Sequence, residues 1–86
     1  MNEMEGKWFR LWYDDKQSML ITMHNNLAAD LSAGYNPFGS SIRQQRQAID
    51  AYMFEFDQQM EAIKMMDKQH TEHWCYYDLL KRGVIS

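Results

Sequence analysis

Apolar residues recur at three- and four-residue steps along the central part of the chain, from Ser41 to Met66. Members of this series are Ile42, Ile49, Tyr52, Met53, Phe56, Met60 and Ile63. Such spacing is typical of one face of an α-helix. The opposite arc is charged, amide-bearing or small, except at Phe54 and Met65. The pattern predicts an amphipathic helix from Ser41 to about Gln69, roughly 43 Å long at 1.5 Å per residue.

A second apolar series lies nearer the N-terminus and has the same helical spacing. It consists of Met19, Leu20, Met23, Leu27 and Leu31. These residues predict a helix from about Asp15 to Ala33. Asp14 or Asp15 would supply the side-chain acceptor that caps the first free N–H groups. Gly34 would end this helix, since glycine readily takes the left-handed conformation that closes a helix C-terminus.

The aromatic run from Trp8 to Tyr13 fits two structures. Its side chains lie at helical spacings, so the run could extend the first helix. They are also aromatic enough for a strand, which would form a short hairpin with Ser18 to Met23 around a turn at residues 14–17. We favour the helix, because the apolar series that follows is clearly helical.

The segment from Gly34 to Gly39 separates the two long helices. Its glycines and Pro37 interrupt helical continuity, and the proline ring moves Asn36 away from the α region. Two aromatic side chains make the segment too apolar for a free linker, so we expect it to be packed down. Ser41 and Gln44 match the S-x-x-Q capping box, which predicts that a serine caps the second helix.

A third helix is predicted near the C-terminus. The apolar series fails across residues 67–73 and then resumes, which predicts a short helix from about Thr71 to Arg82. Apolar residues cover most of the circumference of this helix, so it should pack against more than one element. Gly83 is well placed to close it, with Val84 against Leu79 as in a Schellman motif.

The chain is therefore predicted to be a single all-α domain over residues 1–86, a small helical hairpin or three-helix domain. A long central helix would dominate it, and the short C-terminal helix would close over the pair. A chain of 86 residues buries only about 60 to 65% of its unfolded surface, so the core is thin. The expected core consists of Trp12, Met19, Leu20, Met23, Leu27, Leu31, Ile49, Tyr52, Phe56, Met60, Ile63, Trp74, Tyr77 and Leu80.

Composition and charge narrow the cellular compartment and the classes of partner that we expect for this chain. The formal net charge of −3 opposes nonspecific attraction to nucleic acid or to anionic lipid. There is neither a basic and apolar secretory signal at the N-terminus nor an apolar run long enough to span a membrane. The single cysteine cannot form an internal disulfide and fits a reducing compartment. We therefore expect a cytoplasmic protein without a membrane partner.

Few residues suggest metal binding or catalysis. Asp67, His70 and His73 lie on one side of a helix and offer metal-binding atoms, but their spacing matches no standard site. We interpret them as a solvated polar turn and expect no metal and no cofactor. Cys75 lies between aromatic residues, so it is better explained as a buried small hydrophobe than as a nucleophile. No catalytic set is recognisable, and we do not expect an enzyme.

The start of the second long helix is the candidate nucleic-acid site. Arg43, Gln44, Arg46 and Gln47 carry donors that could contact phosphates and base edges. A helix, a glycine-bearing turn and a second helix also outline a helix-turn-helix. The turn is longer than usual for that motif and there are only two arginines, so we hold this as an alternative. In the favoured interpretation the arginines pair with nearby acids.

The better candidate is a protein interface. Phe54 and Met65 lie on the side of the second helix away from its main apolar face, in a strip with Gln58 and Glu61. A monomer would leave these two apolar side chains exposed. The sequence thus favours a non-enzymatic interaction module, a regulatory accessory protein that self-associates through a long amphipathic helix or binds an unidentified protein. The alternative is a nucleic-acid-binding regulator of helix-turn-helix type.

Overall fold

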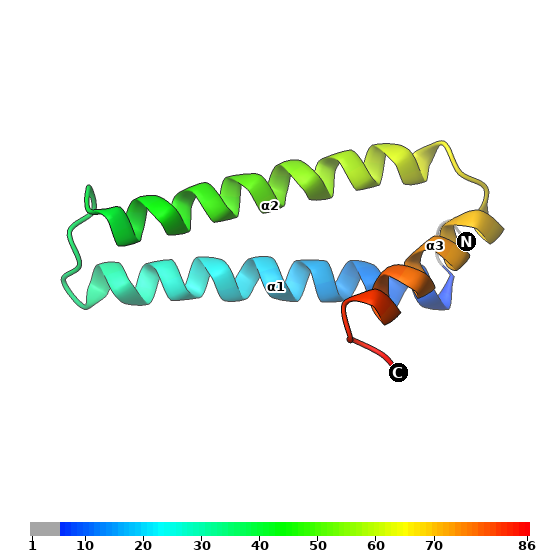
Figure 1. Cartoon of the computed structure of the whole chain (residues 1–86), viewed down its shortest axis with the longest axis horizontal. Coiled ribbons are helices and arrows are strands. Elements are labelled where there is room, and N and C mark those ends of the chain that lie inside the picture. Colours follow the sequence, from blue (N-terminus) through cyan, green and yellow to red (C-terminus); the bar gives the residue numbers. More distant parts are fainter. Residues whose placement is uncertain (1–5) are drawn as a thin grey trace.

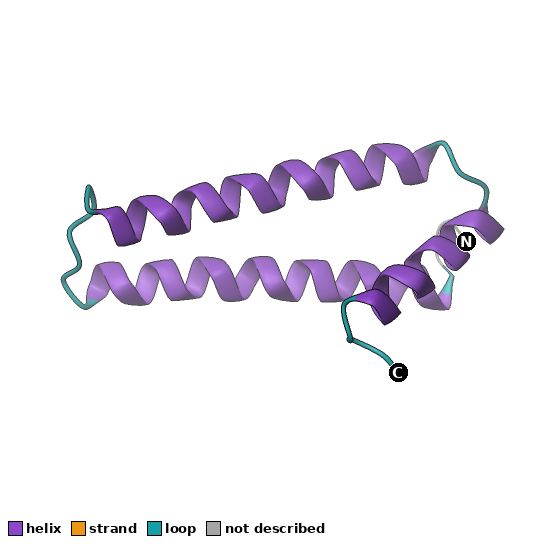
Figure 2. Ribbon diagram, in the orientation of Figure 1, coloured by secondary structure: helices purple, strands orange, loops and turns teal. Residues whose placement is uncertain are grey.

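The computed structural model describes residues 6–86 and contains three helices over that range. They are α1 (Lys7–Ser32), α2 (Ser40–Lys64) and α3 (Lys68–Lys81). No strand occurs between residues 6 and 86 (Figure 2). The predicted all-α, three-helix fold is confirmed, and Trp8 to Tyr13 is helical rather than part of a hairpin.

Helices α1 and α2 form a long antiparallel hairpin, and α3 crosses the N-terminal part of α1 (Figure 1). The hairpin makes the molecule elongated, with extents of 47 × 26 × 24 Å. Its Cα radius of gyration is 15.7 Å, whereas a compact chain of this length has about 12 Å. The half of the hairpin farther from α3 is therefore only two helices thick.

The predicted difference in length between the two long helices was wrong. Helix α1 has 26 residues and α2 has 25. Helix α1 begins at Lys7, well before the predicted start at Asp15, while α2 ends at Lys64 rather than near Gln69. Both differences arise from polar contacts at helix ends that no apolar pattern reveals.

The start of α1 is capped by a residue of α3. The Glu72 carboxylate accepts hydrogen bonds from the backbone N–H groups of Trp8 (3.1 Å) and Phe9 (2.7 Å). Gly6 occupies the N-cap position and has no side chain with which to do this. A Cβ atom at Gly6 would overlap the Glu72 carboxylate, so glycine permits the close approach. The predicted caps, Asp14 and Asp15, lie inside the helix instead.

The break between α2 and α3 is made by Asp67. Its backbone is extended, and its carboxylate accepts the His70 backbone N–H at 2.8 Å, which is an N-cap hydrogen bond. This cap starts α3 at Lys68, earlier than the predicted Thr71. The predicted serine cap of α2 was also wrong, because Gly39 occupies the N-cap position and no side chain caps it.

Two glycines close helices as predicted. Gly34 has φ 94° and Gly83 has φ 75°, both in the left-handed region. After α3, the Gly83 N–H donates to Leu80 O and the Val84 N–H to Leu79 O, each at 3.0 Å. This pair of hydrogen bonds is the Schellman motif, and α1 ends in the same way around Gly34.

The main core lies where α3 crosses the hairpin. Trp12 of α1, Ile63 of α2, and Cys75 and Leu79 of α3 are fully buried and pack together. The cluster is flanked by the partly buried residues Trp8, Phe9, Phe56, Met60, Trp74 and Ile85.

Burial agrees with the predicted core only in part. Trp12, Ile49 and Ile63 are buried as predicted, whereas Met19 and Tyr77 are exposed. Leu79, rather than Leu80, is the fully buried leucine of α3. The broad apolar arc of α3 could not show which of its sides would face α1.

Candidate functional site

The predicted interface residues are all exposed on the outer side of α2. Phe54 is 68% accessible and Met65 is 89% accessible, and Gln58 and Glu61 are exposed between them. At 100° per residue, Phe54 lies roughly 160° around the helix from Phe56, which packs against the core. We call these four residues the outer strip. Met65 is the C-cap of α2 rather than an interior helical residue.

The charges of α2 are segregated along its length. Its N-terminal half carries Arg43 and Arg46 against one acid, Asp50. The C-terminal half carries three acids against one base, and these four residues are Glu55, Asp57, Glu61 and Lys64. All seven side chains belong to exposed residues. The arrangement is opposite to that which stabilises a helix through its dipole, where acids belong near the start and bases near the end.

Most of these charged groups lack an ionic partner within residues 6–86. The only α2 pair there is Lys64 with Glu61, at 3.2 Å between Nζ and Oε1 and largely exposed. The prediction that Arg43 and Arg46 pair with nearby acids was therefore wrong for this part of the chain. Arg43 instead donates a long hydrogen bond of 3.4 Å to the carbonyl of Phe38.

The four candidate nucleic-acid residues lie near the turn of the hairpin. Arg43, Gln44, Arg46 and Gln47 are all exposed. Together with Pro37 and Phe38, the two arginines line an open hollow of about 460 Å³. Phe38 is 84% accessible, Tyr35 is 51% accessible, and the whole segment 34–38 is exposed, so the prediction that this loop is packed down was wrong. Helices α1 and α2 run side by side (Figure 1), whereas the helices of a helix-turn-helix cross steeply.

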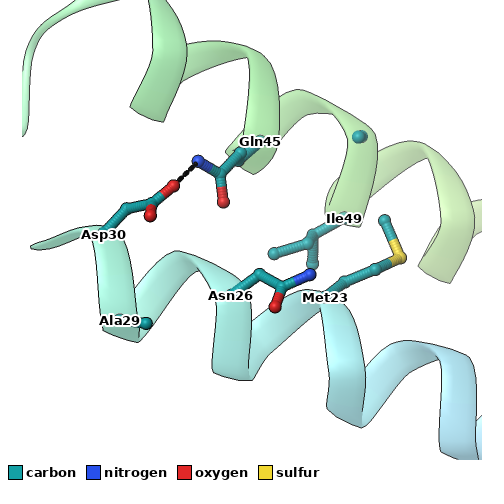
Figure 3. A pocket seen from close by; sticks show the side chains of 7 residues that line it. Met23, Asn26, Ala29, Asp30, Gln45 and Ile49 are labelled. Atoms are coloured by element: carbon teal, nitrogen blue, oxygen red, sulfur yellow. Dashed lines mark hydrogen bonds between the residues drawn. The ribbon is translucent and has the colours of Figure 1, made fainter.

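The seam between α1 and α2 opens into a hollow of about 390 Å³ near Ile49 (Figure 3). One rim is bridged by Gln45, whose Nε2 donates to Asp30 Oδ2 at 2.7 Å. The other lining residues are Met23, Asn26, Ala29 and Ala48. Asp30 is the only ionisable residue in this lining, so the hollow offers no pair of groups for acid–base chemistry.

An apolar hollow lies at the junction of α2 and α3. It has a volume of about 340 Å³ and is lined by Met66, His70, His73, Trp74 and Tyr77. The sequence did not single it out, because its residues come from both sides of the Asp67 break. The His73 ring contacts Tyr77 edge-on, with 5.0 Å between ring centroids.

The possible metal ligands are not assembled. Asp67 is occupied as the N-cap of α3, and its Oδ1 also lies 2.9 Å from His70 Nδ1. The His70 backbone N–H holds the pKa of the Asp67 carboxyl below its usual value. Between residues 6 and 86, no three His, Cys, Asp or Glu side chains are grouped so that they could hold a metal ion.

Cys75 is a buried small hydrophobe, as predicted. Its side chain is fully buried in the core cluster, and this burial raises the thiol pKa to about 12. The thiol therefore stays protonated at neutral pH and is a poor nucleophile.

Sequence reasoning missed a polar cluster that fastens α3 to α1. Trp12 Nε1 donates to Asp78 Oδ2 at 2.8 Å, and Arg82 Nε donates to the same oxygen at 3.0 Å. The Arg82 guanidinium also pairs with Asp15 on α1. Nearby, the buried Lys16 places its ammonium over the rings of Trp12 and Tyr52. No local pattern could have revealed contacts between residues more than sixty positions apart.

None of the helices in residues 6–86 has the length and apolar content needed to cross a membrane. Compared with models of protein families, with curated proteins and with solved structures, the chain matches none of them.

Proposed function

We propose that this protein is a small, non-enzymatic interaction module of the cytoplasm that associates with itself through the outer strip of α2. The observation that carries the proposal is the exposure of Phe54 in the middle of a 25-residue helix. Burying a phenylalanine or methionine side chain contributes about 1.5–3 kcal/mol. A complex in which a partner covers Phe54 and Met65 would therefore be stabilised by their burial.

The shape of the molecule supports this proposal. A two-helix layer covers one face of each helix and leaves the other faces open, and α3 packs mainly against α1 rather than over the outer side of α2. Helices α1 and α2 each bury few residues, and only three of the 25 in α2 are buried. A second protein against α2 would supply the missing layer.

Light scattering coupled to size exclusion, over a tenfold range of concentration, tests the proposal. We expect a mass that rises with concentration toward a dimer or larger species. Phe54→Glu and Met65→Glu should each shift the protein toward monomer. Ile21→Glu is the matched control, since Ile21 is 58% accessible but lies on α1. A monomer at every concentration would exclude self-association.

Nucleic-acid binding through Arg43, Gln44, Arg46 and Gln47 is the second candidate. Its support is the exposure of all four side chains and the lack of an acidic partner for either arginine within residues 6–86. Arg43→Ala and Arg46→Ala should each weaken binding to duplex or single-stranded DNA and reduce the slope of its salt dependence by about one. Absence of DNA binding at low salt would end this candidate.

A further inference from the structure

We infer that the partner of α2 is a second copy of this chain that packs antiparallel, with a two-fold axis near Phe54. In this arrangement the basic half of each α2 faces the acidic half of the other. The inference rests on the proposed self-association and adds the orientation and register of the two copies.

Charge complementarity is the first argument. One half of α2 carries Arg43 and Arg46 with a single acid, and the other carries Glu55, Asp57 and Glu61 with a single base. A parallel pair would bring like charges together at both ends, which is unfavourable. An antiparallel pair brings each basic half against an acidic half, and it does so twice because of the symmetry.

Within residues 6–86 of the monomer, this charge pattern gives only the exposed ion pair of Lys64 with Glu61. Its order opposes the helix dipole, and Arg46 forms no ion pair with Asp50, although they are four residues apart on one helix. An antiparallel neighbour supplies acidic residues opposite Arg43 and Arg46 and also aligns the two helix dipoles favourably.

The positions of the outer strip define the register. With Phe54 on the axis, the two Phe54 rings meet, and aromatic pairs of this kind are favourable. Positions equally distant from Phe54 then face each other, so Gln47 lies opposite Glu61. Arg43, eleven residues before Phe54, lies opposite Met65, eleven residues after it. The methylene stem of the arginine can cover the methionine while its guanidinium reaches the nearby Glu61.

The contact between the two copies is small, so we expect their association to be weak. From Arg43 to Met65 the strip is about 33 Å long at 1.5 Å per residue. A single helix face of this length places the interface at the small end of the range, below about 1,200 Å² in total. We therefore expect a dimer that dissociates on dilution and weakens in high salt.

Charge reversal tests the complementarity. Arg43→Glu with Arg46→Glu leaves Lys64 as the only basic residue of α2, and Asp57→Arg with Glu61→Arg leaves Asp50 and Glu55 as its only acids. Each double variant alone should dimerise about tenfold or more weakly, whereas an equimolar mixture should form a heterodimer. Arg10→Glu with Lys68→Glu is the control for the arginine pair, since it lowers the net charge by the same amount at exposed positions outside α2. Wild-type dimerisation by both double variants would overturn the inference.

Cysteine cross-linking tests the orientation. Gln47→Cys and Glu61→Cys should cross-link efficiently only when the two proteins are mixed. A parallel pair would instead cross-link each variant to itself. Cys75 is fully buried and should not interfere. A wild-type dimer in which Gln47→Cys links to its own copy would overturn the antiparallel register and leave self-association intact. A wild-type monomer at all concentrations would refute self-association itself.

Discussion

The indole N–H of Trp12 donates a hydrogen bond to Asp78, at 2.8 Å, across 66 residues of sequence. The Trp12 side chain is fully buried, and the indole nitrogen is its only polar atom. The hydrogen-bond acceptor that this atom needs is supplied by α3. Asp78 also accepts from Arg82, which pairs in turn with Asp15. A single carboxylate thus completes the core and fixes the C-terminal end of α3.

Asp78→Ala is expected to lower the free energy of unfolding by about 1–3 kcal/mol, because it leaves the buried indole N–H without an acceptor. Urea denaturation followed by tryptophan fluorescence would measure the change. Asp14→Ala is a suitable control, since Asp14 is exposed on α1, and it should change the free energy by less than about 0.5 kcal/mol. Equal stability of the two variants would contradict this role for Asp78.

Glu72→Ala should destabilise the protein by about 1–2 kcal/mol, because it removes the acceptor of two N–H groups at the start of α1. Hydrogen exchange at Trp8 and Phe9 should accelerate in this variant more than at the end of α1. Gln69→Ala, at an exposed position of α3, serves as the control. Unchanged exchange at the two aromatic residues would show that Glu72 is not the cap in solution.

Acid should weaken the α3 cap. The pKa of Asp67 is lower in the folded chain than in the unfolded chain, so the unfolded state binds the proton more readily. The stabilisation is complete above the unfolded value of about 3.9 and is lost as the pH falls from there through the folded pKa. Asp67→Asn keeps a capping oxygen without this titration. Its unfolding midpoint in urea should therefore depend less on pH below 4 than that of the wild type, and an identical dependence would argue against the cap.

Cys75 should resist thiol reagents in the folded protein. Its thiol is buried and has a pKa of about 12, so labelling at pH 8 should be slow and should accelerate as urea opens the core. An unfolded thiol ionises near pH 8.5, so stability should also decline as the pH rises from that value toward 12. Cys75→Ala should show a smaller alkaline loss. Rapid labelling of the native protein would contradict burial.

Local patterns predicted the helices but not the contacts between their ends. The spacing of Ile49 and Ile63 identified the inner face of α2, because burial imposes a helical period on apolar positions. Gly34 and Gly83 identified helix ends, because the left-handed conformation is a local requirement. Glu72 could not be recognised as the cap of α1, since it is separated from Trp8 by 64 positions.

For the outer strip too, the local helical pattern could be predicted and the contacts with distant residues could not. The sequence predicted that Phe54 faces away from the apolar side of α2, because that follows from helical geometry alone. The sequence could not predict whether α3 would cover Phe54, because the break at Asp67 determines the direction in which α3 runs. The sequence marked Asp67 only as part of a solvated polar turn with metal-binding atoms, and its capping role depends on a backbone conformation that the sequence does not display.

The position of Trp12 has a consequence for how the chain is made. A ribosome adds Asp78 66 residues after Trp12, which at 5–20 residues per second is a delay of about 3 to 13 s. Throughout that interval the aromatic N-terminal segment has neither its buried packing partners in α3 nor the carboxylate that caps it. The growing chain must therefore remain free of aggregation, with its aromatic N-terminal segment uncovered, until the residues of α3 have been added.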